Sequence, residues 1–366
     1  MQQGVQSSDH LVKLASMRRS IVPCARTLTR PPLGARRLAK WAIVRAFHCE
    51  VCGAELFFEN SVCVTCGSAV GYSREQGTMV AVKADRPICA NLNRCGCNWI
   101  ADSASASGLC FSCTLTRTRP ADGDMVGLAQ YWVAEAAKRR LIFGLDELRL
   151  PVKVSDGFSG LAFDLLSSSQ GKIMTGYQHG IITLDLAESN DAHREALRAS
   201  MDEPYRTVLG HFRHEIGHYY GELLALVSGR REEFRALFGD ETTSYEAALQ
   251  RHYSNGSGQD WQDNFISAYA TMHPLEDFAE VFGHFLHIAD TLQTAEEFGL
   301  ISDEPRPGPL EAPMADVVAR TWLPLTTGLN QINRSMGRSD LYPFVLGAPV
   351  IAKLAFVADL VAQAEP

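Results

Sequence analysis

The 366-residue sequence has no run of apolar residues that approaches the ~20 needed for a membrane-spanning helix. Its N-terminal region lacks a continuous apolar segment followed by a small-residue cleavage site, the pattern of a secretory signal. Cysteine is absent after Cys113, whereas the disulfide framework of a secreted protein usually extends through the fold. We therefore expect a cytoplasmic protein that does not associate with a membrane.

Basic residues are scarce outside the first 45 positions. Residues 1–45 contain nine Lys and Arg and a single acidic residue, Asp9, whereas residues 46–120 contain six charges of each sign. Residues 121–366 contain 19 basic and 35 acidic residues, a formal charge of −16. Binding to phosphates requires a concentrated basic face, so this distribution argues against a nucleic-acid partner. We predict that residues 1–45 form a disordered basic tail.

All ten cysteines lie within residues 24–113, and most are paired as Cys-x2-Cys. Gly53 and Gly67 each follow the second cysteine of a pair, where a tight turn can direct backbone N–H groups at the sulfur atoms. A module of this size has too little core to fold well without metal, so its zinc is expected to be structural. The first four cysteines have a spacing typical of a four-thiolate zinc site: Cys49-x2-Cys52-x10-Cys63-x2-Cys66.

A second set of cysteines follows the first. Its spacing provides another four-thiolate group: Cys89-x7-Cys97-x12-Cys110-x2-Cys113. Cys95 lies two residues before Cys97, so the spacing leaves open which of these two thiols binds. Cys24 stands alone and is expected to be unligated. Because each set leaves no open position on its ion, we predict two structural zinc ions in a zinc-ribbon module over residues 46–119.

Residues 120–366 are predicted to form a second, mainly helical domain with a small β-sheet. Helical and alternating apolar patterns, together with proline and glycine breaks, mark its elements. The expected elements are a helix over Met125–Leu150, a strand over Gly160–Leu165, a hairpin of Lys172–Tyr177 and Ile181–Leu186, a long helix from Pro204 past Leu223, a helical region from Phe234 to Leu300 with a polar loop at 254–258, and a last helix over Ala348–Ala362.

The long predicted helix contains His214-Glu215-Ile216-Gly217-His218. Residues four apart lie one turn above each other on a helix, so the imidazoles of His214 and His218 can bind one ion. Glu215 projects beside them, where its carboxylate can hold and deprotonate a metal-bound water. Because two surface histidines on an ordinary helix give the same short pattern, a third ligand is needed to support a metal site.

Two carboxylates downstream have the spacing of a third ligand and its support. Glu276 and Glu280 follow Pro274, which can begin a helix, and stand four apart on one helical face. One carboxylate can bind zinc while the other accepts a hydrogen bond from a ligating histidine. We favour Glu276 as the ligand and Glu280 as the supporting residue. His284 and His287 are competing ligands, and a solvated acidic face is the alternative without metal.

At this point the sequence resembles a known family. The histidine motif with the later Tyr269, Glu276 and Glu280 is similar to the gluzincins, the group that includes anthrax lethal factor. A longer resemblance, from about Phe47 to the C-terminus, is to bacterial zinc-binding metallopeptidases that carry an N-terminal zinc-ribbon module. The segments that carry it include Cys97-Asn98-Trp99, Gly210-His211-Phe212-Arg213-His214-Glu215-Ile216-Gly217-His218-Tyr219-Tyr220, Phe265-Ile266-Ser267-Ala268-Tyr269-Ala270, Asn333-Arg334-Ser335-Met336-Gly337 and Asp340-Leu341-Tyr342-Pro343-Phe344.

The resemblance implies an α+β fold, with a small double zinc ribbon followed by a mainly helical, gluzincin-like zincin domain. In gluzincins the first glutamate of the pair binds zinc, which corresponds here to Glu276. The tyrosine faces the developing oxyanion, which corresponds to Tyr269; a core aromatic is the alternative for this residue. The match through Cys97-Asn98-Trp99 favours Cys97 over Cys95 as the second module's ligand.

Together these features predict a zinc-dependent peptidase that hydrolyses peptide bonds of a cytosolic protein or peptide. A zinc-bound water would attack, Glu215 would act as general base, and the chain would hold one catalytic and two structural zinc ions. If the strand Ile181–Leu186 lies at a sheet edge, an extended substrate can pair with it. His211 is expected to be a core histidine or a support for the site. Arg334 is expected to bind a substrate carboxylate or to form a salt bridge.

Two functions from other classes remain as alternatives. One is a ribbon-based adaptor for protein or nucleic acid whose peptidase domain is inactive, and the other is a DNA-associated repair protease. The intact motif argues against the first, because Glu215 and both histidines are present. The balanced charge of the cysteine-rich region argues against the second. Substrate specificity and oligomeric state are not defined by the sequence.

Overall fold

The computed structural model describes residues 46–103, 105–153, 160–168, 171, 173–190, 194, 207–301 and 308–364. The predicted basic tail, residues 1–45, lies outside these ranges, as does Pro204. The described part combines several helices with three small sheets. The predicted α+β class, with a cysteine-rich region followed by a mainly helical one, is confirmed.

Short strands and helices make up the cysteine-rich region. β1 (Phe47–His48) pairs antiparallel with β2 (Glu55–Leu56), and β3 (Val70–Ser73) pairs antiparallel with β4 (Thr78–Ala81). Two helices of one turn follow, α1 (Leu92–Cys95) and α2 (Phe111–Thr114). Elements this short bury little apolar surface among themselves, which fits a module stabilised by metal.

The cysteine-rich region packs on α3 (Met125–Glu147) through a cluster of aromatic rings. The ring centroid of Phe143 on α3 lies 4.6 Å from that of Phe58 and 5.2 Å from that of Tyr72. The buried Trp99 lies 5.0 Å from Tyr72 in the same cluster. Because aromatic rings bury a large apolar area, α3 enlarges a core that the ribbons form from Phe58, Tyr72 and Trp99.

A four-stranded sheet combines one strand that precedes α3 with three strands that follow it, in the strand order β5-β6-β8-β7. Its members are β5 (Thr116–Thr118), β6 (Ala162–Leu166), β7 (Gly176–Gln178) and β8 (Ile181–Asp185). β6 runs parallel to both β5 and β8, and β7 runs antiparallel to β8. The last strand of the cysteine-rich region therefore belongs to the same sheet as the later strands.

The predicted hairpin is present, with β7 and β8 joined through His179 and Gly180, but its first strand is Gly176–Gln178 and not Lys172–Tyr177. Gly180 has φ +80°, and a Cβ at this position would lie 2.0 Å from the carbonyl oxygen of Gly160, so only glycine fits. Substrate pairing with the strand over residues 181–186 was expected only if that strand lay at the sheet edge, and this condition is not met. β6 pairs with the other side of β8, which leaves β7 as the edge strand.

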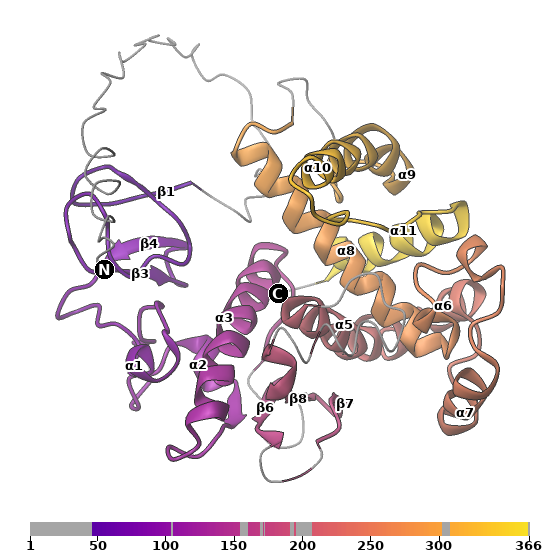
Figure 1. The fold of residues 1–366 in the computed structure, drawn as a ribbon, viewed down its shortest axis with the longest axis horizontal. Helices are drawn as coiled ribbons and strands as arrows, with labels where there is room; N and C mark the ends of the chain where they lie inside the picture. Colours follow the sequence, from indigo (N-terminus) through magenta and orange to yellow (C-terminus); the bar gives the residue numbers. More distant parts are fainter. Residues whose placement is uncertain are drawn as a thin grey trace, which may run out of the picture. The chain divides into compact units, whose positions relative to one another are not determined.

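Helices form the rest of the described chain. α5 begins at Val208, and the start predicted at Pro204 lies outside the described residues. Figure 1 shows α5 and α8 side by side, with α11 against α8. No helix in the described ranges is both long and apolar enough to cross a membrane. The helices are α5 (Val208–Tyr220), which continues through a wider turn over Gly221–Leu226, α6 (Arg231–Phe238), α7 (Tyr245–Asn255), α8 (Pro274–Glu297), α9 (Met314–Val317), α10 (Leu323–Ser335) and α11 (Ala348–Gln363).

Candidate metal centre

The motif helix α5 has a capped start and carries two histidines on one face. The hydroxyl of Thr207 accepts a hydrogen bond from the N–H of Gly210 at 2.9 Å, which satisfies one of the donors that a first helical turn leaves unpaired. His214 and His218 follow on this helix, and their Nε2 atoms are 3.2 Å apart. The spacing of four therefore brings both imidazoles to one point.

Small residues allow α5 to approach α8 closely beside this point. A Cβ on Gly217 would lie 2.8 Å from the Cα of Ala279 and 2.9 Å from its carbonyl oxygen, which is too close for any side chain. Gly283 of α8 faces the backbone of Arg213, with 3.4 Å to a built Cβ. These contacts pair later residues of one helix with earlier residues of the other. The two helices are thus antiparallel, and α8 side chains reach the two imidazoles.

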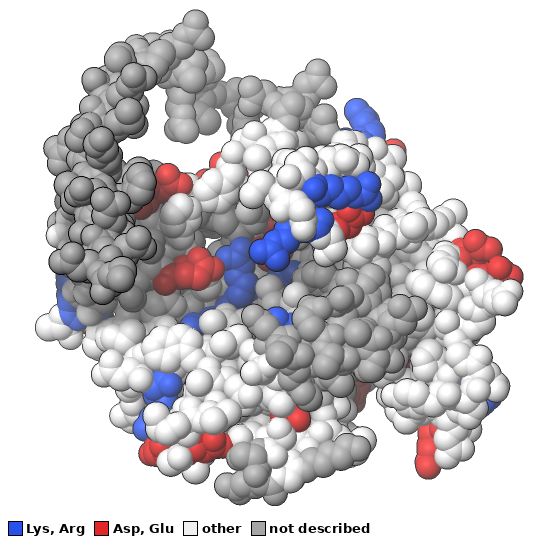
Figure 2. All heavy atoms as spheres, viewed as in Figure 1, with Lys and Arg blue, Asp and Glu red and all other residues white. Residues whose placement is uncertain are grey.

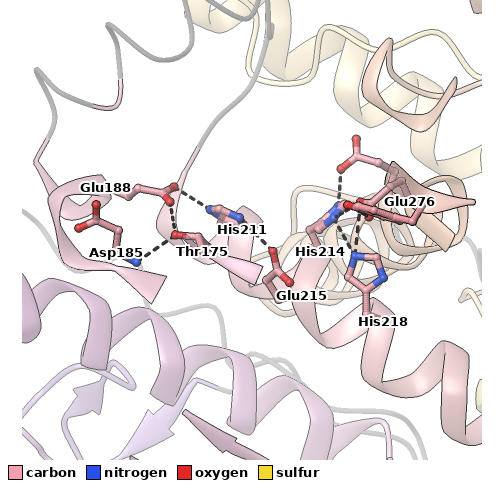
Figure 3. A network of polar contacts seen from close by, with 10 residues as sticks. Thr175, Asp185, Glu188, His211, His214, Glu215, His218 and Glu276 are labelled. Carbon is pink, nitrogen blue, oxygen red and sulfur yellow. Dashed lines mark hydrogen bonds and ion pairs between the residues drawn. The ribbon is translucent and has the colours of Figure 1, made fainter. Parts of the chain in front are cut away.

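Glu276 of α8 completes a cluster of three ligand atoms (Figure 3). Its Oε2 lies 2.9 Å from Nε2 of His214 and 3.4 Å from Nε2 of His218. Donors placed ~2.0–2.1 Å from a tetrahedral zinc ion are separated by about 3.3 Å, so the cluster fits one zinc ion. Two imidazole nitrogens and one carboxylate oxygen, with a fourth position left open, are typical of a catalytic zinc site.

Two further side chains form hydrogen bonds with the ligand residues His214 and Glu276. Oε1 of Glu280 lies 2.7 Å from Nδ1 of His214, which can donate its proton and leave Nε2 for the ion. Tyr245, the first residue of α7, donates its hydroxyl to Oε1 of Glu276 at 2.9 Å and leaves Oε2 for the ion. Glu280 lies where the sequence pattern suggested. Tyr245 was not predicted, because it belongs to no motif and lies 31 residues from its partner.

Burial and neighbouring charges act in opposite directions on the pKa values of Glu276 and Glu280. Burial raises the pKa of Glu276, but His218 and His214 hold the pKa of that carboxyl well below its usual range. Burial also raises the pKa of Glu280, and the hydrogen bond and charge of His214 outweigh it and lower the pKa to about 2. Both carboxyls are therefore negatively charged inside the protein, where a bound divalent cation would neutralise them.

Glu215 lies next to the cluster with only one of its oxygens engaged. Oε1 is 3.2 Å from Nε2 of His211. The side chain is buried, and Oε2 has no hydrogen-bond partner among the residues that the structure describes. A buried polar atom without a partner is costly unless water or a ligand satisfies it. Oε2 therefore marks a position where a water or a substrate group can bind.

Tyr269 lies beside the same histidine, in a single turn over Tyr269–Thr271 that precedes α8. Its ring centroid is 5.9 Å from that of His214 and 6.1 Å from that of His252. Burial raises the pKa of the Tyr269 hydroxyl, and the charge of Glu276 raises it further, so the group stays protonated at neutral pH. The side chain is thus close enough to act at the centre, and its role stays a prediction.

The two competing ligands, His284 and His287, are engaged elsewhere. Nδ1 of His284 is 2.9 Å from the hydroxyl of Tyr342, and Nδ1 of His287 is 2.6 Å from the guanidinium of Arg213. Neither histidine belongs to the three-ligand cluster. The geometry therefore favours Glu276 over both.

The other polar residues selected from the sequence also have protein partners. Arg334 forms two hydrogen bonds of 2.6 Å with the carboxylate of Asp340, which is the salt-bridge alternative. His211 is half-buried between the carboxylates of Glu188 and Glu215. Glu188 was not predicted, since only the folded chain brings it to the motif helix.

The first cysteine set gathers at one point. Its four sulfur atoms lie within 4.8 Å of one another, with 3.8 Å between Cys49 and Cys66. Neighbouring ligands of a zinc ion with Zn–S bonds of ~2.3 Å are about 3.8 Å apart, so the set fits a four-thiolate ion. Gly53 and Gly67 both have φ +75°, as the predicted turns require. Their N–H groups donate to the carbonyls of Cys49 and Cys63 and not to sulfur.

The second set contains Cys97, as the resemblance implied. Its sulfur lies 3.5 Å from that of Cys110, and the N–H of Cys110 donates to the sulfur of Cys89 at 3.3 Å. All four sulfurs of this set are buried within 4.8 Å of one another, which fits a second structural ion.

Cys95 lies next to this second set and outside it. Its sulfur groups with that of Cys113 and a carboxylate oxygen of Glu135. The guanidinium of Arg139 lies 3.9 Å from the Cys95 sulfur. Cys24 lies outside the described residues.

The chain thus combines two four-thiolate cysteine sets with a later cluster of two histidines and a glutamate that leaves one position open. This combination is typical of a zinc-binding metallopeptidase that carries a zinc ribbon. Comparison with known families agrees with this class. Residues 127–360 match the family described as "Putative zinc-binding metallo-peptidase", and residues 46–124 match a zinc-ribbon domain. The chain belongs to this metallopeptidase family.

Similar curated proteins come from mycobacteria. The uncharacterized protein Rv2568c of Mycobacterium tuberculosis (strain H37Rv) is 51% identical over 333 residues, covering 88% of this chain and 97% of the relative. The uncharacterized protein Mb2598c of Mycobacterium bovis gives the same identity and coverage. No solved structure matches the chain significantly. The relatives thus extend the family likeness through both the ribbon and the peptidase regions.

Proposed function

We propose that the chain is a zinc-dependent peptidase that hydrolyses peptide bonds of a cytosolic protein or peptide, with Glu215 as general base. One observation carries the proposal: Oε2 of Glu215, the residue that follows His214, is buried with no hydrogen-bond partner among the described residues, and one ligand atom each of His214, His218 and Glu276 converge within 4.8 Å. A structural zinc site has no need of such an oxygen, whereas hydrolysis requires a base next to the open position of the ion.

The chain supplies the proton transfers of this reaction. A zinc ion in the cluster would lower the pKa of a water molecule to about 7 and polarise the scissile carbonyl. Glu215 would accept the water proton at Oε2 and return it to the leaving amine. His214 is held by Glu280 at Nδ1, so its ring keeps the orientation that Nε2 ligation needs.

Tyr269 is proposed to stabilise the negative charge that develops on the carbonyl oxygen. Its hydroxyl remains a proton donor at neutral pH, because burial and the charge of Glu276 raise its pKa. A donor aimed at a developing oxyanion contributes about 3 kcal/mol to transition-state stabilisation. The position of its ring near His214 supports this role.

An extended substrate is proposed to pair with β7 and not with β8. β7 is the edge of its sheet, with no strand on its outer side among the residues that the structure describes. Tyr177 of β7 stacks on the imidazole of His218 with 6.1 Å between ring centroids, and its hydroxyl donates to Glu222 at 2.7 Å. A peptide added to this edge would therefore lie next to the ligand cluster.

The distribution of charge supports a protein or peptide substrate over a nucleic acid. On the face shown in Figure 2, basic and acidic side chains are interspersed over the described residues. Among the described residues, several basic side chains are paired with carboxylates, such as Arg74 with Asp146 and Arg117 with Asp164. Paired cations offer little to a phosphate backbone, which requires a concentrated positive surface.

The proposal is tested with Glu215→Gln, which keeps the size of the side chain and removes its basicity. Cleavage of unfolded casein and of a fluorescence-quenched peptide library should fall to background, because water activation loses its base. Zinc content should stay that of the unmodified protein, since Glu215 is not a ligand. Unchanged cleavage with Gln at this position would refute the role of Glu215.

A further inference from the structure

Glu215 is the end of a chain of polar contacts that leads away from the ligand cluster (Figure 3). Its Oε1 faces Nε2 of His211, one helical turn earlier on α5, at 3.2 Å. Nδ1 of the same ring faces Oε2 of Glu188 at 2.6 Å. Because both ring nitrogens face carboxylate oxygens, each can donate a hydrogen, and the imidazole is held from two sides.

Glu188 is itself fixed to the sheet. It lies in the single turn Leu186–Ser189 that directly follows β8. Its Oε1 accepts a hydrogen bond from the hydroxyl of Thr175 at 2.9 Å, and that hydroxyl accepts one from the N–H of Asp185 at 3.0 Å. The contacts therefore run from the end of the sheet through Glu188 and His211 to Glu215.

The two carboxylate side chains in this series of polar contacts are buried. Glu188 is 5% exposed and Glu215 is 4% exposed. Burial lowers the pKa of His211, but the two neighbouring carboxylates outweigh it and raise the pKa to about 9. In a site that excludes water, hydrogen bonds between charged groups are short and directional. These contacts therefore restrict the orientation of the Glu215 carboxylate.

We propose that His211 and Glu188 are positioning residues: His211, held by Glu188, fixes Oε1 of Glu215 so that Oε2 points at the open position of the metal centre. This inference rests on the proposed function, because it assigns a task to Glu215. Neither His211 nor Glu188 touches the ion or the substrate in this account. A general base displaced by 1 Å loses about 100-fold in rate, so holding Oε1 in place is a substantial contribution.

Two amide substitutions separate positioning from mere packing. In His211→Gln the amide nitrogen reaches the ε position and can still donate to Glu215. In His211→Asn the same amide reaches only the δ position, where it faces Glu188 and leaves Oε1 of Glu215 without its donor. The pair thus differs by one methylene group and by the contact that the proposal requires.

The expected kinetic result is a difference between these two variants. With the peptide substrates, kcat of H211N should fall about 100-fold with KM changed little, and kcat of H211Q should fall much less. H284Q is the control, because His284 is another buried histidine and its Nδ1 lies 2.9 Å from the hydroxyl of Tyr342. All three variants should keep the zinc content of the unmodified protein. Equal losses in H211Q and H211N, or zinc loss in either, would overturn the positioning role.

A binding measurement gives the same test without turnover. Acetohydroxamate chelates zinc through two oxygens and requires a nearby base to accept its proton, so its affinity reports on Glu215. Calorimetry with the zinc-loaded full chain should show binding that is weakened about tenfold or more in H211N and retained in H211Q. E215Q sets the lower limit. Affinity in H211N equal to that of the unmodified protein, with E215Q weakened, would overturn positioning alone. No difference between the unmodified protein and E215Q would overturn the proposed function, and the positioning role with it.

Discussion

The cysteine-rich region and the helical region each offer metal ligands, but they do so in opposite ways. The cysteine sets provide four sulfur atoms each, drawn from turns and one-turn helices, and leave no open position. The helical region provides three ligand atoms from α5 and α8, two long helices with a shared core. We propose that a metal bound in the first case would stabilise the fold, whereas in the second the fold itself brings the ligands together.

The surroundings of the two kinds of site differ in the same sense. Sulfur atoms of the second set are buried against one another, and the N–H of Cys110 donates to one of them. In the helical region, by contrast, Oε2 of Glu215 is buried without a hydrogen-bond partner among the described residues. An unsatisfied carboxylate oxygen is a cost to stability that a purely structural site would avoid. The comparison therefore supports the proposal that the helical cluster is the reactive centre, because its ligand number and its buried carboxylate oxygen both differ from those of the cysteine sets.

The largest expected effect is on the closed sites. Cys97→Ser should release one zinc ion and unfold the cysteine-rich module, because structural zinc contributes on the order of 10 kcal/mol to small domains. Cys95→Ser is the matched control, two residues away and outside the set, and should keep full zinc content. Elemental analysis and circular dichroism measure both effects. Zinc loss in C95S with retention in C97S would reverse the assignment of the ligand.

At the open centre, Glu276→Ala should lose one zinc ion while the helices stay folded, since α5 and α8 pack through apolar residues and glycine. Glu280→Ala should keep the ligand set and weaken zinc affinity about 10- to 100-fold, because only the support of His214 is removed. Competition with a chelator of known affinity measures both. Full zinc content in E276A would point to His284 or His287 as the third ligand.

Tyr269→Phe sharpens the comparison by leaving metal binding intact and removing one proton donor. We expect kcat to fall about 100-fold with little change in KM, as for the loss of one oxyanion donor. Tyr253→Phe, at an exposed position of α7, is the control and should be silent. Steady-state kinetics with the quenched peptides decide the matter, and equal rates for Y269F and the unmodified chain would make Tyr269 a packing residue.

The smallest effect concerns the contact between α5 and α8. Gly217→Ala places a Cβ 2.8 Å from the backbone of Ala279, so the helices must separate and unfolding free energy should fall by about 1–3 kcal/mol. Gly144→Ala in α3 meets nothing within 4 Å and should stabilise by about 0.5–1 kcal/mol. Urea unfolding measures the difference. Equal stability of the two variants would contradict the close approach.

Short motifs and helical periodicity predicted most of the ligand atoms. His214 and His218 are four apart on one helix, and Pro274 begins the helix that carries Glu276 and Glu280. Both pairs therefore needed only local geometry. The cysteine spacings predicted the two four-thiolate sets for the same reason. Spacing alone could not decide between Cys95 and Cys97 as the ligand, and the family resemblance was needed for that choice.

Features that depend on distant parts of the chain were not predictable in the same way. The hairpin was found, but the sequence left open which of its strands lies at the sheet edge, because the pairing of β6 with β8 follows no local pattern. Tyr245 of α7 contacts Glu276, and Glu188 in the turn after β8 contacts His211, but no local pattern marks either residue. Supporting residues are defined by tertiary contacts, whereas ligands on one helix are defined by spacing.

Counting zinc in the purified full-length chain tests the central claim most directly. Elemental analysis should give three zinc ions per chain, one in each cysteine set and one held by His214, His218 and Glu276. His214→Ala should reduce the count to two. A count of two in the unmodified chain, unchanged in H214A, would leave the helical cluster without an ion and contradict the account.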